Sequence, residues 1–395
     1  MRRARYLSLA GVLVGLLAST APAVVAQEGT FHTVAPDGSG DYETISAAIE
    51  AASAGGTILI SPGTYVEHLE IDKDLTLSGQ GDRADVVIEP PEDQAERDVG
   101  GGDTGVVLIW VEDADVTLEG FTLGPRPGFG IVIKGGTADI RDIDIPDTIL
   151  VLEDAVVSVE DSELMLLNFE GPNETTIAGS TMRNGAFAWA GASATFEDNE
   201  VINGPIVAED GASITVVGNT FAPSEDEAGV VIAEPESTGY IADNEFTGGW
   251  AGIILEYPVE STAERNAVTG AANGIVAVES GGVIRDNTIV DAGEYGIYTV
   301  GEGMTVEDNT VEGGRVGLFS MLLPPPAHPR ATDYQAGPFG CGNTITGASH
   351  FGVLVEDAPA EISDNVICAE RESLKIEGEA NLVLGTNEIG DAGAE

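Results

Sequence analysis

Basic residues are scarce in this 395-residue chain. It holds 16 lysines and arginines against 67 aspartates and glutamates, which gives a formal net charge of −51 at pH 7. A nucleic-acid site needs a basic face, so this composition excludes nucleic acid as a partner. An acidic polysaccharide is also repelled unless cations bridge it. The acidity fits a saline habitat, divalent-cation binding or the solubility of an elongated body, and the sequence does not choose among them.

Long apolar runs are absent beyond the first residues. Arg2, Arg3 and Arg5 precede an apolar run over residues 6–17, and small residues follow at 24–26. This order is typical of a secretory signal peptide, so we expect residues 1–26 to direct export into the periplasm, onto the cell surface or into the medium. No later stretch reaches about 18 consecutive apolar residues, and we expect no membrane span in the mature chain.

Cysteine and histidine are also rare. Cys341 and Cys368 are candidates for a disulfide in an exported protein, although Cys341 lies two residues before one repeated asparagine and Cys368 lies three residues after the next one. The four histidines include no pair with the spacing of metal ligands or of a catalytic triad. We therefore expect no metal site built on them, while the many carboxylates leave Ca²⁺ as a candidate cofactor.

Asparagine, in contrast, recurs at nearly fixed intervals. The repeated pattern is an apolar residue, any residue, Asp or Gly, Asn, any residue and an apolar residue. A period in the low twenties indicates a solenoid, in which each repeat stacks on its neighbours. One step, of 34 residues, is longer than the others. The repeated asparagines are Asn199, Asn219, Asn244, Asn266, Asn287, Asn309, Asn343, Asn365 and Asn387.

A second signature, Gly followed by alternating apolar residues, occurs in the later repeats. It appears at residues 252–255, 274–277, 296–299, 317–320 and 352–355. Short β-rich runs between Asn and Gly corners predict three short parallel strands per coil, with successive coils about 4.8 Å apart. Asparagine suits corner conformations, and its amide can bond the same amide in the next coil. We therefore interpret the asparagines as an internal structural ladder rather than as ligands.

The passage after the signal peptide contains a short predicted helix. Residues 44–52 have one apolar helical face, and Thr44 is the expected N-cap. With Gly40-Asp41-Tyr42 before it and Gly63-Thr64-Tyr65-Val66-Glu67 after it, this passage resembles the N-terminal region of pectinesterases. The resemblance implies the right-handed parallel β-helix repeat family, also called the pectin-lyase-like superfamily. In that family such a helix covers the first coil.

We expect an all-β fold, a single-stranded right-handed parallel β-helix of about 22 residues per coil with a short N-terminal capping helix. The domain is expected over residues 27–395, with the cap and first coils at 27–80. An acidic, Gly-rich loop is expected to leave the coils at 89–104. The coils then resume in diverged form from Val106, and a Pro-rich loop is inserted at 321–340, inside the long asparagine step.

The catalytic signatures of the similar enzymes are missing. The chain has no Gln-Asp-Thr, Asp-Phe-Ile-Phe-Gly or Gly-Arg-Pro-Trp of pectinesterases, no polygalacturonase motif and no Asp-Pro-His of alginate epimerases. A polysaccharide lyase would need an arginine base beside Ca²⁺-binding carboxylates. Candidates for catalysis are Arg285 and Arg315 in the central coils and His328 and Arg330 in the Pro-rich loop. The sequence leaves open whether the protein is an enzyme.

Alternation along the Gly-apolar strands sends one row of side chains outward. This row is apolar and aromatic, which indicates either a binding surface or a face covered by another segment. Two functions stay open: binding or processing of polysaccharide on the outer face of one sheet, or a non-catalytic surface or periplasmic scaffold or adhesion rod. The oligomeric state is open as well. The candidates for polysaccharide contact are Trp250, Tyr295, Tyr298, Phe319 and Phe351.

Overall fold

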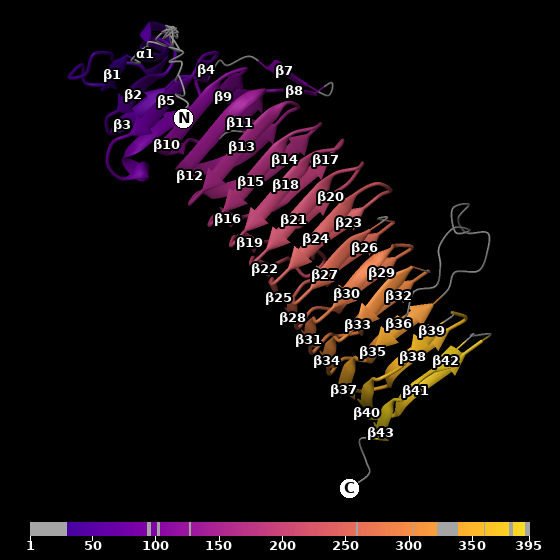
Figure 1. Cartoon of the computed structure of the whole chain (residues 1–395). Coiled ribbons are helices and arrows are strands. Elements are labelled where there is room, and N and C mark those ends of the chain that lie inside the picture. The colour runs from indigo at the N-terminus through magenta and orange to yellow at the C-terminus, as the bar shows by residue number, and fades with distance from the viewer. Residues whose placement is uncertain are drawn as a thin grey trace, which may run out of the picture.

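The computed structural model describes residues 30–92, 96–100, 103–125, 128–257, 260–301, 303–321, 339–358, 360–378 and 382–391. The chain winds into a parallel β-solenoid of about 15 turns with about 22 residues per coil, which confirms the expected all-β architecture. Figure 1 shows the coils stacked in chain order from the indigo N-terminal end to the yellow C-terminal end. The expected signal peptide at residues 1–26 and residues 322–338 of the expected Pro-rich loop lie outside the described residues.

Each coil contributes strands to three faces, which we name sheets 1, 2 and 3. In sheet 1 every strand pairs in parallel with the strand one coil further along. A bridge between Cys341 and Ser363 leads on to β39 (Ala360–Ile362) and β42 (Leu382–Leu384). The strands of sheet 1 are β1 (Phe31–Val34), β2 (Gly56–Ile60), β5 (Leu75–Gly79), β10 (Asp115–Leu123), β12 (Gly136–Val151), β13 (Ala155–Glu160), β15 (Glu174–Ala178), β18 (Ser193–Glu197), β21 (Ser213–Val217), β24 (Thr238–Ala242), β27 (Ser261–Glu264), β30 (Gly282–Arg285), β33 (Met304–Glu307) and β36 (Phe339–Cys341).

Sheet 2 follows the asparagine corner of each coil. The long strands β10 and β12 continue around this corner, so their later residues pair in sheet 2. The other strands of sheet 2 are β3 (Gly63–Val66), β6 (Val86–Glu89), the start of β14 (Glu163–Glu170), β16 (Thr181–Met182), β19 (Glu200–Ile202), β22 (Thr220–Ala222), β25 (Glu245–Thr247), β28 (Ala267–Thr269), β31 (Thr288–Val290), β34 (Thr310–Glu312), β37 (Thr344–Ala348), β40 (Val366–Ala369) and β43 (Glu388–Asp391).

Sheet 3 contains the Gly-apolar signature. The ends of β12 and β14 belong to it, and all of its neighbours pair in parallel. Its other strands are β4 (Leu69–Ile71), β9 (Val107–Glu112), β11 (Phe129–Lys134), β17 (Ala186–Trp189), β20 (Ile206–Ala208), β23 (Ala228–Ala233), β26 (Ala251–Glu256), β29 (Asn273–Val278), β32 (Tyr295–Val300), β35 (Val316–Met321), β38 (Phe351–Glu356) and β41 (Glu372–Glu377).

The interior of the solenoid is one continuous apolar core. On sheet 3, Ile253, Ile275, Ile297 and Leu318 point inward and are fully buried, as the alternation predicts. The residues between them form a row of register partners on the opposite face of the sheet, and they pack in separate apolar clusters rather than in the core. This outer row runs through Val231, Ile254, Val276, Tyr298, Phe319 and Leu354.

A short helix lies beside the first coils. Helix α1 (Ile45–Ala51) buries Ile45, Ala48 and Ile49 in the apolar core, and the Thr44 hydroxyl accepts from the Ala47 N–H. The Glu67 carboxylate accepts from the N–H groups of Ile45 and Ser46 at 2.8 and 2.9 Å. A carboxylate is favourable there because the first N–H groups of a helix lack partners in the helix. The role of α1 as a cap over the first coil stays a prediction.

Part of the acidic segment expected at 89–104 forms a hairpin in a sheet of its own, while Glu89 still belongs to β6 of sheet 2. Strands β7 (Arg97–Gly100) and β8 (Asp103–Gly105) pair antiparallel, whereas the strands of the three sheets pair in parallel. Figure 1 shows this hairpin projecting beside β9 and β11 at the N-terminal end. A 3₁₀ turn, η1 (Arg83–Asp85), precedes β6 on another face of the solenoid.

The nine repeated asparagines lie at one corner and bond to one another. Each Nδ2 and backbone N–H from Asn199 to Asn365 donates to the Oδ1 of the next asparagine, at 2.8–3.1 Å. In the diverged coils the hydroxyls of Ser162 and Ser180 take the accepting position. The left-handed conformation falls on the residue before the asparagine, for example Asp243 at φ 58° and Gly218 at φ 71°. Short polar residues and glycine tolerate that region best, which explains why the pattern carries Asp or Gly there.

The two cysteines do not form the disulfide considered from the sequence. Both thiols are free. Cys341 ends a strand of sheet 1, and its Sγ lies 3.2 Å from the Ser363 hydroxyl. Cys368 lies in β40 of sheet 2, one coil further along and beyond the asparagine corner. The corner between the two sheets directs the two side chains to different faces, so they do not meet.

Candidate functional site

Four of the five aromatic candidates gather on the outer face of sheet 3. Tyr298 and Phe319 are register partners, and their rings stack with centroids 5.0 Å apart. The Tyr295 ring centroid lies 5.0 Å from that of Tyr298 and 5.4 Å from that of Phe319. Phe351 packs against the same group from the next coil. We call Tyr295, Tyr298, Phe319 and Phe351 the aromatic cluster.

The aromatic cluster is only partly buried. Phe319 is buried, whereas Tyr295, Tyr298 and Phe351 remain partly open to solvent. Burial raises the pKa of the Tyr298 hydroxyl, with smaller contributions from Tyr295 and Glu356. The Lys375 ammonium lies 4.7 Å from the Phe351 ring centroid, within the range of a cation–π contact. The cluster is therefore an amphipathic surface with hydroxyls and charges at its margin.

Trp250, the fifth aromatic candidate, lies apart from the cluster. It precedes β26, two coils before β32, and is 43 % exposed. No ring contact among the described residues joins it to Tyr298. An apolar patch lies between them, and this patch packs against Tyr298 through Val276 and its neighbours. The outer face of sheet 3 is therefore apolar from β23 to β38, with Trp250 on its border.

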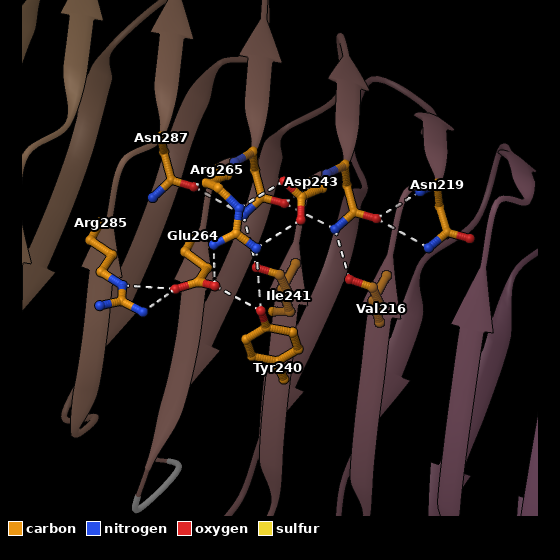
Figure 2. A network of polar contacts seen from close by, with 11 residues as sticks. Val216, Asn219, Tyr240, Ile241, Asp243, Glu264, Arg265, Arg285 and Asn287 are labelled. Carbon is orange, nitrogen blue, oxygen red and sulfur yellow. Dashed lines mark hydrogen bonds and ion pairs between the residues drawn. The ribbon is translucent and has the colours of Figure 1, made fainter.

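Arg285, the first catalytic candidate, belongs to a network on the outer face of sheet 1. Its Nε donates to Glu264 Oε2 at 2.7 Å, and Arg265 and Tyr240 donate to Glu264 Oε1. Arg265 also pairs with Asp243 through two bonds of 2.8 Å each. Figure 2 shows Glu264 between the two guanidinium groups, beside the asparagine corner. The Glu264 side chain is only 4 % exposed.

The electrostatics of this network favour fixed ion pairs. The hydrogen bond from Tyr240, and those from Arg265 and Arg285, lower the pKa of Glu264 to about 2 despite its burial. The hydrogen bond to Glu264 raises the pKa of Arg285 above its ordinary value. A guanidinium held in its charged form is a poor proton acceptor. The geometry therefore suits Arg285 to holding a carboxylate and disfavours it as a base.

The remaining catalytic candidates do not assemble with Arg285. Arg315 pairs with Glu294 at 2.9 Å beside Tyr295, and this hydrogen bond raises its pKa. His328 and Arg330 lie outside the described residues. Among the described residues no group of three or more His, Cys, Asp or Glu is placed to hold a metal ion. Arg285 lies on sheet 1, whereas Arg315 directly precedes a strand of sheet 3.

A cleft beneath the β7–β8 hairpin is the feature that the sequence reasoning missed. Its volume is about 670 Å³, within the range of ligand pockets, and it lies over the first strands of sheet 3. The Arg97 guanidinium carbon lies 3.7 Å from the centroid of the Trp110 ring, and Trp110 belongs to the same outer row as Tyr298. The cleft is lined by two basic side chains, Arg97 and Lys134. Because basic residues are scarce in this chain, two of them in one cleft mark it as a candidate ligand site.

Comparison with known families agrees with this architecture. Residues 173–322 match the family model described as "Right handed beta helix region". This stretch of the chain is similar to right-handed β-helix regions. The match includes the ladder asparagines from Asn199 to Asn309 and ends at the start of the expected Pro-rich loop. No curated protein matches the sequence.

Solved β-helix structures resemble this β-helix only distantly. A family 28 exopolygalacturonase from Yersinia enterocolitica is 15 % identical, with a TM-score of 0.37 over 88 % of this chain and 74 % of the other. The A-module of a mannuronan C-5 epimerase from Azotobacter vinelandii is 14 % identical, with a TM-score of 0.43 over 86 % and 94 %. A mannuronic acid specific polysaccharide family 6 lyase from the human gut microbiota is 16 % identical, with a TM-score of 0.39 over 82 % and 77 %. Similarity at this level does not assign the activities of these enzymes to this chain.

Within the described part of the chain, the helices are too short and too polar to cross a membrane.

Proposed function

We propose that this β-helix is an exported protein that binds a polysaccharide along the outer face of sheet 3. The observation that carries the proposal is the aromatic cluster, in which rings from three successive coils meet on a face that is outside the core. A partly exposed apolar surface of this kind marks an interaction site more often than an ordinary surface. Successive coils repeat such contacts along the solenoid axis, which suits a long, repetitive ligand.

The chemistry of the cluster matches a sugar chain. Aromatic rings offer flat apolar surfaces for the C–H faces of pyranose rings, while tyrosine hydroxyls remain available for hydrogen bonds. Glu294 and Glu356 lie at the margin of the cluster. Glu294 pairs with Arg315 beside Tyr295, and Glu356 contributes to the raised pKa of Tyr298. Carboxylates accept hydrogen bonds from sugar hydroxyls. Because these margins are acidic, a neutral polysaccharide is favoured over an acidic one unless a cation bridges them.

The state of the two candidate arginines supports binding without catalysis. Arg285 and Arg315 are each held by a carboxylate, and their raised pKa values disfavour proton abstraction. We therefore include no catalytic step. The alternative, a scaffold or adhesion rod without a glycan ligand, makes the opposite prediction in the experiment below.

The test is affinity chromatography and titration calorimetry on pectin, alginate and neutral glycans, each with and without Ca²⁺. We expect retention on at least one glycan, and Tyr298→Ala and Phe351→Ala should each weaken binding by about tenfold, the effect of losing one ring-stacking contact. The matched control is Phe31→Ala, which removes a ring that is 61 % exposed at the other end of the chain and should leave binding unchanged. Absence of retention on every glycan would favour the rod.

A further inference from the structure

The cleft beneath the hairpin has an apolar wall to which both the hairpin and sheet 3 contribute side chains. Val99 of β7 packs with Trp110 and Leu152 in a cluster of its own, separate from the solenoid core. Arg97 stacks on Trp110 and pairs with Glu70 at 3.0 Å, which ties the hairpin to sheet 3. The hairpin is therefore fixed as one side of a cleft of about 670 Å³.

The two cations of the cleft already have partners. Arg97 is paired with Glu70, and Lys134 donates to Glu112 at 3.1 Å. Trp110 is 7 % exposed beneath the Arg97 guanidinium and also donates from its indole N–H to Glu112 at 3.3 Å. An anionic ligand would have to displace these carboxylates, so the cleft is poorly suited to uronates.

Two carboxylates of the cleft, Glu153 and Glu170, form no ion pair among the described residues. Glu170 ends β14, and Glu153 follows β12 by two residues on the preceding coil, so both come from neighbouring strands of sheet 3. Lys134 donates its hydrogen bond to Glu112, and Glu153 lies near enough to contribute to the raised pKa of the Lys134 ammonium. Asp98 accepts from the Gly100 N–H of its own turn at 3.0 Å. Four lining carboxylates and two lining cations leave an excess of two negative charges.

We propose that this cleft is a second ligand site, independent of the aromatic cluster, that binds a primary ammonium group through Glu153 and Glu170. A ligand that enters the cleft removes water from the two carboxylates, and this loss is offset only if the ligand brings positive charge. The apolar wall of Val99, Trp110 and Leu152 contacts the uncharged part of the ligand. Amino sugars and aliphatic polyamines share this chemistry.

The experiment titrates the full-length protein with a glucosamine tetramer, its N-acetylated counterpart, spermidine and a galacturonate tetramer at about 0.15 M salt, where long-range attraction is screened. We expect the two amines to bind and the N-acetylated and acidic tetramers to fail. Tighter binding of glucosamine tetramer assigns the site to amino sugars, and tighter binding of spermidine assigns it to polyamines.

Variants separate the cleft from the general acidity of the surface. Glu153→Gln with Glu170→Gln should weaken amine binding by at least about tenfold, since two charge-assisted hydrogen bonds are lost. Glu200→Gln removes one exposed carboxylate of sheet 2, outside the cleft, and should change nothing. Equal affinities in all variants, or equal binding of the N-acetylated tetramer, would overturn the proposal. Retained binding in Tyr298→Ala would show that the site does not depend on the proposed polysaccharide surface.

Discussion

At the residue scale, the asparagine ladder shows how one buried amide holds three coils together. Asn266 is buried, and its Nδ2 donates to the Ile241 carbonyl and to Asn287 Oδ1, both at 2.9 Å. Its own Oδ1 accepts from the backbone and side chain of Asn244. Removing such a group leaves several buried donors and acceptors without partners, which costs more than the bonds themselves contribute.

We expect Asn266→Ala to lower the free energy of unfolding by about 3 kcal/mol, because buried polar groups on both neighbouring coils lose their partners. The measurement is urea unfolding followed by circular dichroism. Asn387→Ala is the matched control, since Asn387 is the last asparagine of the ladder and is partly exposed. The Asn387→Ala substitution should lower the free energy of unfolding clearly less than Asn266→Ala does. Equal losses in the two variants would mean that the ladder is not a cumulative stacking device.

Glu264 is the second residue whose role can be tested in isolation. Its folded-state pKa of about 2 lies below the ordinary value of 4.5. The stabilisation from its ionised form is therefore complete above pH 4.5 and is lost as the pH falls from about 4.5 to about 2. This difference in pKa corresponds to about 3 kcal/mol at neutral pH.

Glu264→Gln should lower the free energy of unfolding at pH 7 by about 3 kcal/mol, since it leaves Arg265 and Arg285 without their buried partner. The difference in unfolding free energy between wild type and variant should become smaller when unfolding is repeated at pH 3. Glu245→Gln, an exposed change on the neighbouring coil, is the control and should have little effect at either pH. A gap that stays constant with pH would contradict the ion-pair account.

At the scale of elements, the sequence was most informative where one rule repeats. Alternation along each Gly-apolar strand was enough to separate Ile297 from Tyr298, and the register then brought Tyr298 beside Phe319. The sequence repeat was less informative about the backbone conformation at the corners between strands. The sequence placed the asparagines at the corners, and the left-handed conformation falls on the residue before them, such as Asp243 and Arg265. The period alone does not say which residue of a corner has positive φ.

The hairpin shows why the cleft could not be read from the sequence. Residues 89–104 have no apolar period, so the sequence predicted a loop there and no contact of that loop with the coils. The position of Arg97 over Trp110 depends on how the hairpin folds back onto sheet 3, which is a tertiary contact between unrelated patterns. In the sequence, Glu153 and Glu170 are two of many carboxylates, and no motif distinguishes them. Only the position of the hairpin over the neighbouring coils makes them walls of one cleft.

At the scale of the whole molecule, the dominant quantity is charge. The formal net charge of −51 is spread along an elongated solenoid whose buried carboxylates are few, Glu264 among them. Exposed like charges repel one another and destabilise the compact state. This repulsion is screened by salt, because the Debye length falls from about 30 Å at about 0.01 M to about 3 Å at about 1 M. Salt should therefore act on the whole β-helix rather than on a single site.

We expect the melting temperature to rise by several degrees between about 0.01 M and about 1 M NaCl at pH 7, measured by circular dichroism. At about pH 4, where many carboxylates are partly protonated, the same salt step should produce a clearly smaller rise. This comparison separates charge screening from the general strengthening of apolar burial by salt, which does not depend on carboxylate ionisation. An equal rise at both pH values would attribute the salt effect to apolar burial and leave the surface charge without a role in stability.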